Sequence, residues 1–97
     1  MAIDFDKLEV VNNKQAKRFE VKLEDDVAVV EYQLTGSIIT FTHTEVPPAY
    51  EGHGIAGKIA KVALEYAKDH NLKVLPLCPY IKAYILRHPE YKSITYG

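Results

Sequence analysis

Hydrophobic and polar positions alternate through most of the first half of the chain, which is the pattern of half-buried β-strands. In the first alternating run Phe19, Val21 and Leu23 share one face, and the residues between them are charged. The three predicted strands are Arg18–Leu23, Ala28–Leu34 and Ile38–Val46. Because only short polar turns separate them, we expect an antiparallel meander.

The period of the apolar positions changes in the second half of the chain. Apolar residues recur at three- and four-residue spacing across Gly54–His70, with lysines on the opposite face, which predicts an amphipathic helix. Asn71 follows as a left-handed helix stop. A short buried strand, Lys73–Leu77, and a second helix, Tyr80–Arg87, come next, and His88-Pro89 ends that helix.

The predicted element order is therefore β-β-β-α-β-α. If the third and fourth strands are parallel, the helix between them makes a right-handed βαβ crossover. We predict an α+β fold with an α/β-like core, in which a mixed sheet combines the antiparallel meander with one crossover. The 97 residues form one domain, 1–97, with residues 1–10 as a loosely ordered lead-in.

Three glycines connect the third strand to the long helix, in the segment Glu51-Gly52-His53-Gly54-Ile55-Ala56-Gly57. When a glycine turn connects a strand to the start of a helix, free backbone N–H groups and the positive helix end lie at one point. Such an arrangement binds phosphate groups. A dinucleotide fingerprint is excluded, because the motif lies past the midpoint and the next apolar run ends in Cys78-Pro79. A P-loop is excluded, because the glycines are too close together and Lys58 is followed by Ile59.

The loop residues Glu51–Ala56 resemble the acyl-CoA pyrophosphate loop of the GNAT N-acetyltransferase superfamily, written Q/R-x-x-G-x-G/A. From about Val11 to Ile94 the chain is similar to a family of very short, stand-alone GNAT-like proteins. That similarity is carried by Arg18-Phe19-Glu20, His43-Thr44-Glu45-Val46-Pro47, Pro76-Leu77-Cys78-Pro79-Tyr80 and His88-Pro89-Glu90-Tyr91. It implies the central half of a GNAT fold, without the helices that usually follow the first strand and without the last two strands.

The resemblance implies acetyl-CoA as co-substrate. The expected cofactor-binding residues are Val46, Gly52, His53, Gly54, Ile55, Ala56, Gly57, Lys58 and Tyr80. Backbone groups at the end of the third strand would pair with the pantetheine arm, and because Pro47 has no N–H the donors must come from Glu45 or Val46. The alternative to a cofactor site is that the glycine turn binds no ligand and only bends the chain into the helix.

One loop position departs from the family pattern. Glu51 stands where the family has Gln or Arg, and a carboxylate beside a pyrophosphate is unfavourable unless it points away. We therefore expect Glu51 to cap the helix, and Lys58 is the nearest cation that could offset its charge.

Acetyl transfer to an amine needs a base for the amine and an acid for the leaving CoA thiolate. His43 and Glu45 lie two apart and so share a strand face, with Phe41 beside them. We favour Glu45 as the base because it is nearer the strand end, and we expect His43 to be hydrogen-bonded within the fold. Tyr84, four residues after Tyr80, resembles the superfamily's general acid, although its register differs from the usual pattern.

Cys78 ends the fourth predicted strand, and Pro79 is a favoured first residue of a helix. A helix N-terminus favours the nucleophilic thiolate form of a cysteine, so Cys78 is a candidate catalytic residue. It is equally a candidate for lining the thioester slot or for filling the core as a small buried residue. Direct attack of the amine on acetyl-CoA needs no cysteine, and we favour that mechanism.

Composition narrows the function classes. A net charge of −1 gives no general attraction to nucleic acid or to an anionic membrane. One cysteine suits a reducing compartment, and neither a signal peptide nor a membrane-spanning run is visible, so we expect a cytoplasmic protein. No histidine pair has zinc-site spacing, so we expect no metal.

We therefore expect an N-acetyltransferase that transfers an acetyl group from acetyl-CoA to an amine, either of a small molecule or of a protein lysine or N-terminus. The elements absent from this chain normally wall the acceptor pocket, so either a partner chain supplies them, as in a homodimer, or the pocket is open. Two alternatives stay open. One is a non-catalytic CoA-binding module, and the other is a scaffold whose glycine loop binds no cofactor.

Overall fold

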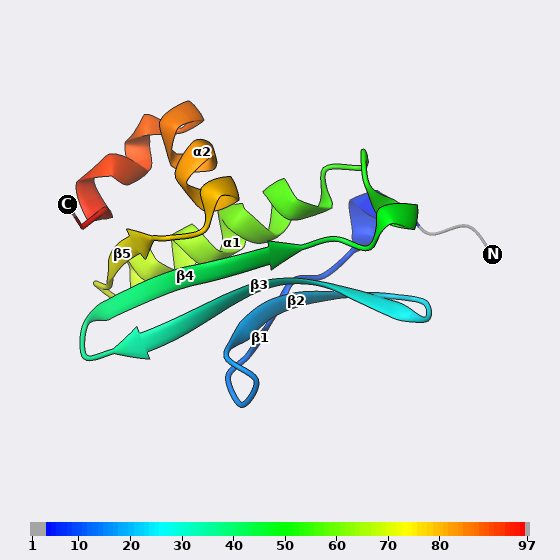
Figure 1. Ribbon diagram of the computed structural model, residues 1–97, viewed down its shortest axis with the longest axis horizontal. Helices are drawn as coiled ribbons and strands as arrows, with labels where there is room; N and C mark the ends of the chain where they lie inside the picture. Colours follow the sequence, from blue (N-terminus) through cyan, green and yellow to red (C-terminus); the bar gives the residue numbers. More distant parts are fainter. Residues whose placement is uncertain (1–3, 97) are drawn as a thin grey trace.

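The computed structural model describes residues 4–96 and contains one five-stranded sheet in the order β1-β2-β3-β4-β5 (Figure 1). The strands are β1 (Val11–Asn13), β2 (Arg18–Leu23), β3 (Asp26–Thr35), β4 (Ile38–Glu45) and β5 (Lys73–Pro76). The helices are α1 (Ile55–Asp69) and α2 (Pro79–Arg87), and the 3₁₀ turns are η1 (Phe5–Lys7), η2 (Pro48–Tyr50) and η3 (Pro89–Ile94). Neighbouring strands from β1 to β4 are antiparallel, and β5 is parallel to β4.

The predicted α+β fold with a mixed sheet is confirmed, because β2–β4 form the antiparallel meander and α1 connects the parallel strands β4 and β5. Strand β1 was not predicted, since its three residues Val-Asn-Asn are too few to show alternation. The domain boundaries and a loose lead-in stay predictions. The described part of that lead-in includes the turn η1.

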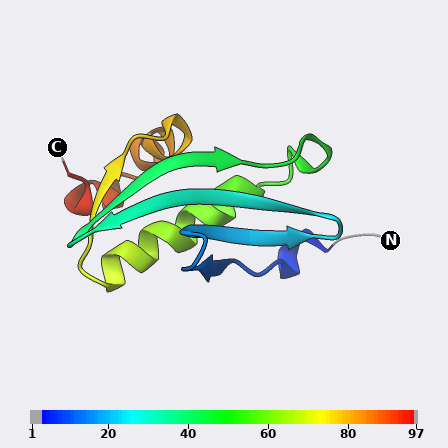
Figure 2. The same ribbon diagram turned by 60° about the horizontal axis from the view of Figure 1, so that its bottom comes forward.

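Both helices pack on one face of the sheet (Figure 2). Helix α1 crosses β2 and β3, and α2 lies beside β4, β5 and the first helix. The fully buried residues at the centre of this layer are Phe19, Val21, Leu23, Val30, Ile39, Phe41, Ile59, Leu64, Val74 and Ile81. In the described part of the chain no helix covers the other face of the sheet, so side chains on that face meet solvent.

A β-bulge at Thr42 reverses which side chains of β4 face the helices. Phe41 pairs with Tyr32 and His43 pairs with Glu31, so Thr42 is an extra residue without a cross-strand partner. Phe41 is fully buried under the helices, whereas His43 lies on the open face. The prediction that Phe41 lies beside His43 on one face is therefore wrong, because simple alternation does not hold across a bulge.

The ends of the helices follow local sequence signals with one exception. Asn71 adopts a left-handed φ of 55°, as predicted, and Pro79 occupies the first turn of α2. At the start of α1 the N-cap is Gly54, with φ 74°, and no side chain makes a capping hydrogen bond there. The expectation that Glu51 caps this helix is therefore wrong, because Glu51 instead follows η2 as an exposed residue.

The C-terminal turn η3 is held to α1 through a tyrosine. Tyr91 is 4% exposed, and its hydroxyl donates a hydrogen bond of 2.6 Å to Oε2 of Glu65. His88 lies at the end of α2 with Nδ1 2.9 Å from the carbonyl oxygen of Tyr84. Burial, followed by the hydrogen bond and the charge of Glu65, raises the pKa of Tyr91 well above its ordinary value.

We predict that Tyr91→Phe lowers the free energy of unfolding by about 1–2 kcal/mol at neutral pH, because Glu65 loses its buried donor. Since the folded pKa of Tyr91 is raised, this contribution is fully present below the unfolded pKa of about 10 and is lost as the pH rises above it. Urea unfolding at pH 7 and above pH 10 measures the difference, with Tyr96→Phe as the exposed control. A constant difference across this range would contradict the assignment.

Candidate functional site

The glycine loop between η2 and α1 is open on its outer side. Gly52 and Gly54 adopt left-handed φ values of 86° and 74°, which glycine allows at low cost. A Cβ atom at either position would meet nothing within 4 Å. Because no side chain caps α1 in the described chain, its first backbone N–H groups are available to a ligand at the positive end of the helix.

The other predicted loop residues differ in what they present to this space. Ile55 is 3% exposed, so only its backbone can contact a ligand, and Ala56 is half-buried. Gly57 faces α2 instead, because a Cβ there would lie 3.4 Å from the hydroxyl oxygen of Tyr80. His53 is exposed and stacks on the ring of Phe5.

The parallel pairing of β4 and β5 stops before β4 ends. Its last Cα partners are Phe41 and Pro76, and the final backbone hydrogen bond runs from the N–H of Cys78 to the carbonyl oxygen of Phe41, at 2.9 Å. Beyond that point β4 continues to Glu45 while the other chain segment turns into α2. We name the region between residues 42–46 and residues 77–78 the strand gap, and Val46 lies half-buried at its end.

Cys78 lies at the inner wall of the strand gap. It is 3% exposed, and its Sγ is 3.1 Å from Oγ1 of Thr44, on the helix-facing side of β4. This contact was missed from the sequence, where Thr44 was named only as part of the family motif at the end of the third strand. The residues are 34 positions apart, and only the parallel pairing of β4 with β5 brings them together.

The starts of the two helices meet beside the strand gap. Tyr80, in the first turn of α2, places its hydroxyl against Gly57 in the first turn of α1, and Cys78 is the N-cap of α2. Both helix ends that converge here carry partial positive charge. The glycine loop, Tyr80, Cys78 and Thr44 are therefore linked by contacts around two positive helix ends, an arrangement that favours an anionic group.

Tyr84 does not join this arrangement. It is 7% exposed, and its ring stacks on the ring of His88 with centroids 4.0 Å apart. Burial in this packing, with a smaller contribution from Tyr80, raises the pKa of Tyr84. The half-buried Tyr80 presents its hydroxyl oxygen to the start of α1, 3.4 Å from the Cβ position of Gly57, whereas Tyr84 approaches the same position only with a ring carbon, at 3.9 Å.

His43 and Glu45 pair with each other on the open face of the sheet. Nε2 of His43 lies 3.1 Å from Oε1 of Glu45, and the two side chains are 55% and 68% exposed. His43 is hydrogen-bonded, as expected, but its partner is the exposed Glu45 and not a core residue, because the bulge turns His43 away from the core. Thr44 and Cys78 lie on the other side of β4.

Charged residues missed from the sequence surround this pair. Glu31 lies directly beside His43 on β3, and Arg18 lies beside Glu31 on β2. Arg18 in turn makes a 2.7 Å ion pair with Glu20, which is 8% exposed. The register of the three strands alone places Arg18, Glu31 and His43 in one cross-strand row. No spacing in the sequence could have indicated that row.

Residues 4–96 contain neither a cluster of potential metal ligands nor a helix that could cross a membrane. No three histidine, cysteine or acidic side chains in this range are grouped so that they could hold a metal ion. No helix in this range has the length and apolar character needed to cross a membrane.

Comparison with known proteins gives concordant results. Residues 18–94 match the family model of the GCN5-related N-acetyl-transferases. Protein NATD1 of Mus musculus is 39% identical over 85 residues, which cover 84% of this chain and 77% of that protein. NATD1 of Homo sapiens is 38% identical, covering 84% and 75%, and NATD1 of Danio rerio is 34% identical, covering 88% and 82%.

A solved structure has the same fold. The solution NMR structure of a GCN5-like candidate N-acetyltransferase from Staphylococcus aureus superposes with a TM-score of 0.73. The match covers 93% of this chain and 89% of that chain, at 25% sequence identity.

Proposed function

Because the chain belongs to the GCN5-related N-acetyltransferase family, we propose that it transfers an acetyl group from acetyl-CoA directly to an amine. The observation that carries this proposal is the uncapped, open glycine loop at the start of α1, adjacent to the strand gap. The loop can receive a pyrophosphate, and the gap can receive an extended arm. One site could thus hold both the pyrophosphate and the pantetheine arm of an acyl-CoA.

In this proposal the backbone of residues 52–58 holds the pyrophosphate. The empty space above Gly52 and Gly54 lets phosphate oxygens approach the N–H groups, and the ammonium of Lys58 adds a positive charge. Glu51 is exposed and free of the helix end, so its carboxylate can point into solvent. Backbone groups of residues 45–46 and the polar wall formed by Thr44 and Cys78 would line the arm.

The transfer step needs two proton movements. The amine nitrogen forms a bond to the thioester carbonyl carbon, the carbon–sulfur bond breaks, and the CoA sulfur leaves as a thiolate. We assign the base to Glu45, with His43 as its hydrogen-bonded partner, because both reach solvent beside the strand gap. We assign the acid to Tyr80 in preference to Tyr84, because the Tyr84 ring is packed against His88.

A non-catalytic acyl-CoA-binding module is the second candidate function. The burial of Tyr84 favours it, since its ring is packed against His88 and cannot act on a substrate without movement. The exposed pair of His43 and Glu45 favours the enzyme. An amine as the acceptor, a homodimer and a cytoplasmic location stay predictions.

We predict that Gly54→Asn weakens CoA binding by at least about tenfold, because asparagine tolerates the left-handed backbone but fills the space that the pyrophosphate needs. Gly36→Asn is the matched control. Gly36 also has a positive φ, of 58°, and nothing within 4 Å of its Cβ position, and it lies in the β3–β4 turn. Calorimetric titration with CoA and melting temperatures compare the variants. Equal affinities in folded proteins would remove the loop assignment.

We predict that Cys78→Ser retains acetyl transfer at a reduced rate, because direct attack requires no cysteine sulfur and serine keeps a polar contact to Thr44. Mass spectrometry of the wild type after incubation with acetyl-CoA should show no stoichiometric acetyl group on Cys78. An acetylated Cys78 that passes its group to an amine at the turnover rate would replace this mechanism by a covalent one.

We predict that Glu45→Gln lowers the acetylation rate about a hundredfold while CoA affinity stays within about twofold, because the base acts on the amine and not on CoA. His43→Gln should lower the rate less and leave the melting temperature unchanged, since His43 is exposed. Glu24→Gln, in the β2–β3 turn, is the charge-matched control. Unchanged turnover in folded Glu45→Gln would withdraw the base assignment and favour the binding module.

A further inference from the structure

The N-terminal turn η1 lies against the glycine loop. The ring of Phe5 stacks on the ring of His53, with centroids 4.0 Å apart and planes at 1°. Nζ of Lys58 donates to the carbonyl oxygens of Phe5 and Asp6, at 3.5 and 3.4 Å. The two Lys58 hydrogen bonds join residues that are separated by 53 and 52 positions in the sequence. They are therefore tertiary contacts, made at the start of α1.

The same turn has anchors of its own. The Asp4 carboxylate accepts the N–H of Asp6 at 3.1 Å, and the Asp4 carbonyl oxygen accepts the N–H of Lys7 at 3.1 Å. Phe5 and Leu8 are half-buried and pack against the edge of the hydrophobic core. Residues 4–8 can therefore hold this position when the loop carries no ligand. We name them the N-terminal strap.

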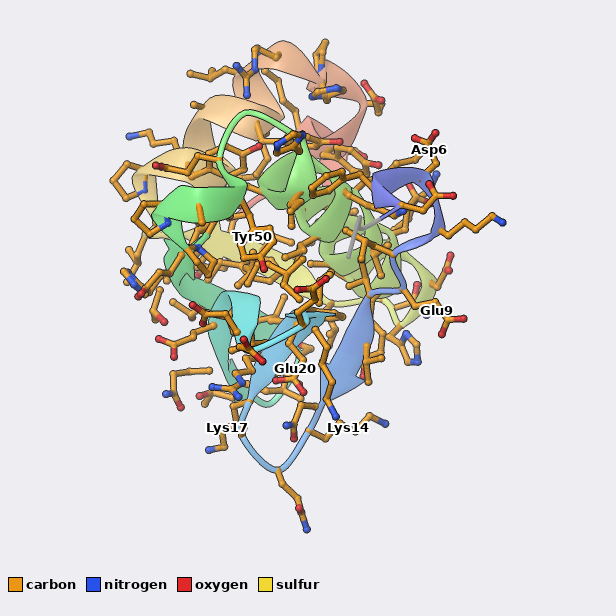
Figure 3. All side chains as sticks on the ribbon, turned by 90° about the vertical axis from the view of Figure 1, so that its right-hand side faces the viewer. Asp6, Glu9, Lys14, Lys17, Glu20 and Tyr50 are labelled. Atoms are coloured by element: carbon orange, nitrogen blue, oxygen red, sulfur yellow. The ribbon has the colours of Figure 1, made fainter. Side chains whose placement is uncertain are left out.

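The strap engages a cation of the proposed pyrophosphate site. The Lys58 ammonium, proposed to add positive charge to the phosphate site, is directed to backbone carbonyls of the strap. Asp4 and Asp6 bring two exposed carboxylates to this end of the molecule, and Figure 3 shows Asp6 on η1 beside α1. Negative charges there are stabilised by the helix end but repel a bound pyrophosphate.

We propose that the N-terminal strap competes with the pyrophosphate of CoA for the Lys58 ammonium and for the approach to the glycine loop beside His53. This inference rests on the proposed CoA site. The strap must leave His53 and Lys58 before the loop can be fully occupied. The apparent affinity for CoA is then reduced by the fraction of molecules in which the strap is open.

The test is a calorimetric titration of the full chain with free CoA. Phe5→Ala removes the ring that stacks on His53, and we expect it to raise CoA affinity about fivefold by increasing the open fraction. Val11→Ala is the matched control, because Val11 is an exposed apolar residue of β1, after the strap. Its affinity should equal that of the wild type.

Proton NMR of the His53 ring reports the strap independently of affinity. The stacked Phe5 ring shifts the His53 ring protons in the free wild type, and Phe5→Leu, which keeps an apolar side chain, should abolish this shift. Saturation of the wild type with CoA should move the signals to the position seen in Phe5→Leu. Identical His53 signals in free wild type and free Phe5→Leu would overturn the strap.

The outcomes separate this inference from the proposed function. Higher affinity in Phe5→Ala, with release of the His53 shift on CoA binding, supports the competition. Equal or lower affinity in Phe5→Ala, with normal binding to the wild type, overturns the strap and leaves the CoA site standing. Absence of CoA binding to both proteins overturns the CoA site, and the competition with it.

Discussion

The hydrogen bond between Phe41 and Cys78 marks the point on which the arrangement of the site depends. It is the last backbone hydrogen bond of the parallel pairing between β4 and β5, and after it the two chain segments follow different courses. One continues along β3 as the end of β4, and the other turns immediately into α2. If the pairing continued, the strand gap would be filled by backbone hydrogen bonds and no arm of a ligand could enter.

The packing of the two helices follows from the same turn. Because Cys78 is both the end of the pairing and the N-cap of α2, the first turn of α2 is fixed against the start of α1. Gly57 lies at this approach, since a Cβ there would stand 3.4 Å from the hydroxyl oxygen of Tyr80, in van der Waals contact. Two positive helix ends are thereby held beside one strand end, which gives the site its preference for an anion before any charged side chain contributes.

The bulge at Thr42 places the candidate site residues of β4 on both faces of the sheet. On the helix side β4 presents Thr44 to Cys78, and on the open side it presents His43 and Glu45 to solvent. A donor that enters from the helix side and an acceptor that approaches from the open side could therefore meet at the strand gap. The cross-strand row that includes Glu31 and Arg18 gives the open face its own charge pattern.

The sequence by itself determined the elements and the loop, because their signals are local. Alternation and helical periodicity fix β2, β3, β4 and α1, while the glycines, Asn71 and Pro79 act through their own backbone preferences. The tertiary structure alone decided which side chains meet. The bulge moved Phe41 away from His43, the parallel pairing joined Thr44 to Cys78, and the packing at the start of α1 brought Phe5 onto His53. Strand register and contacts between distant residues depend on how the whole core packs, and no local pattern carries that information.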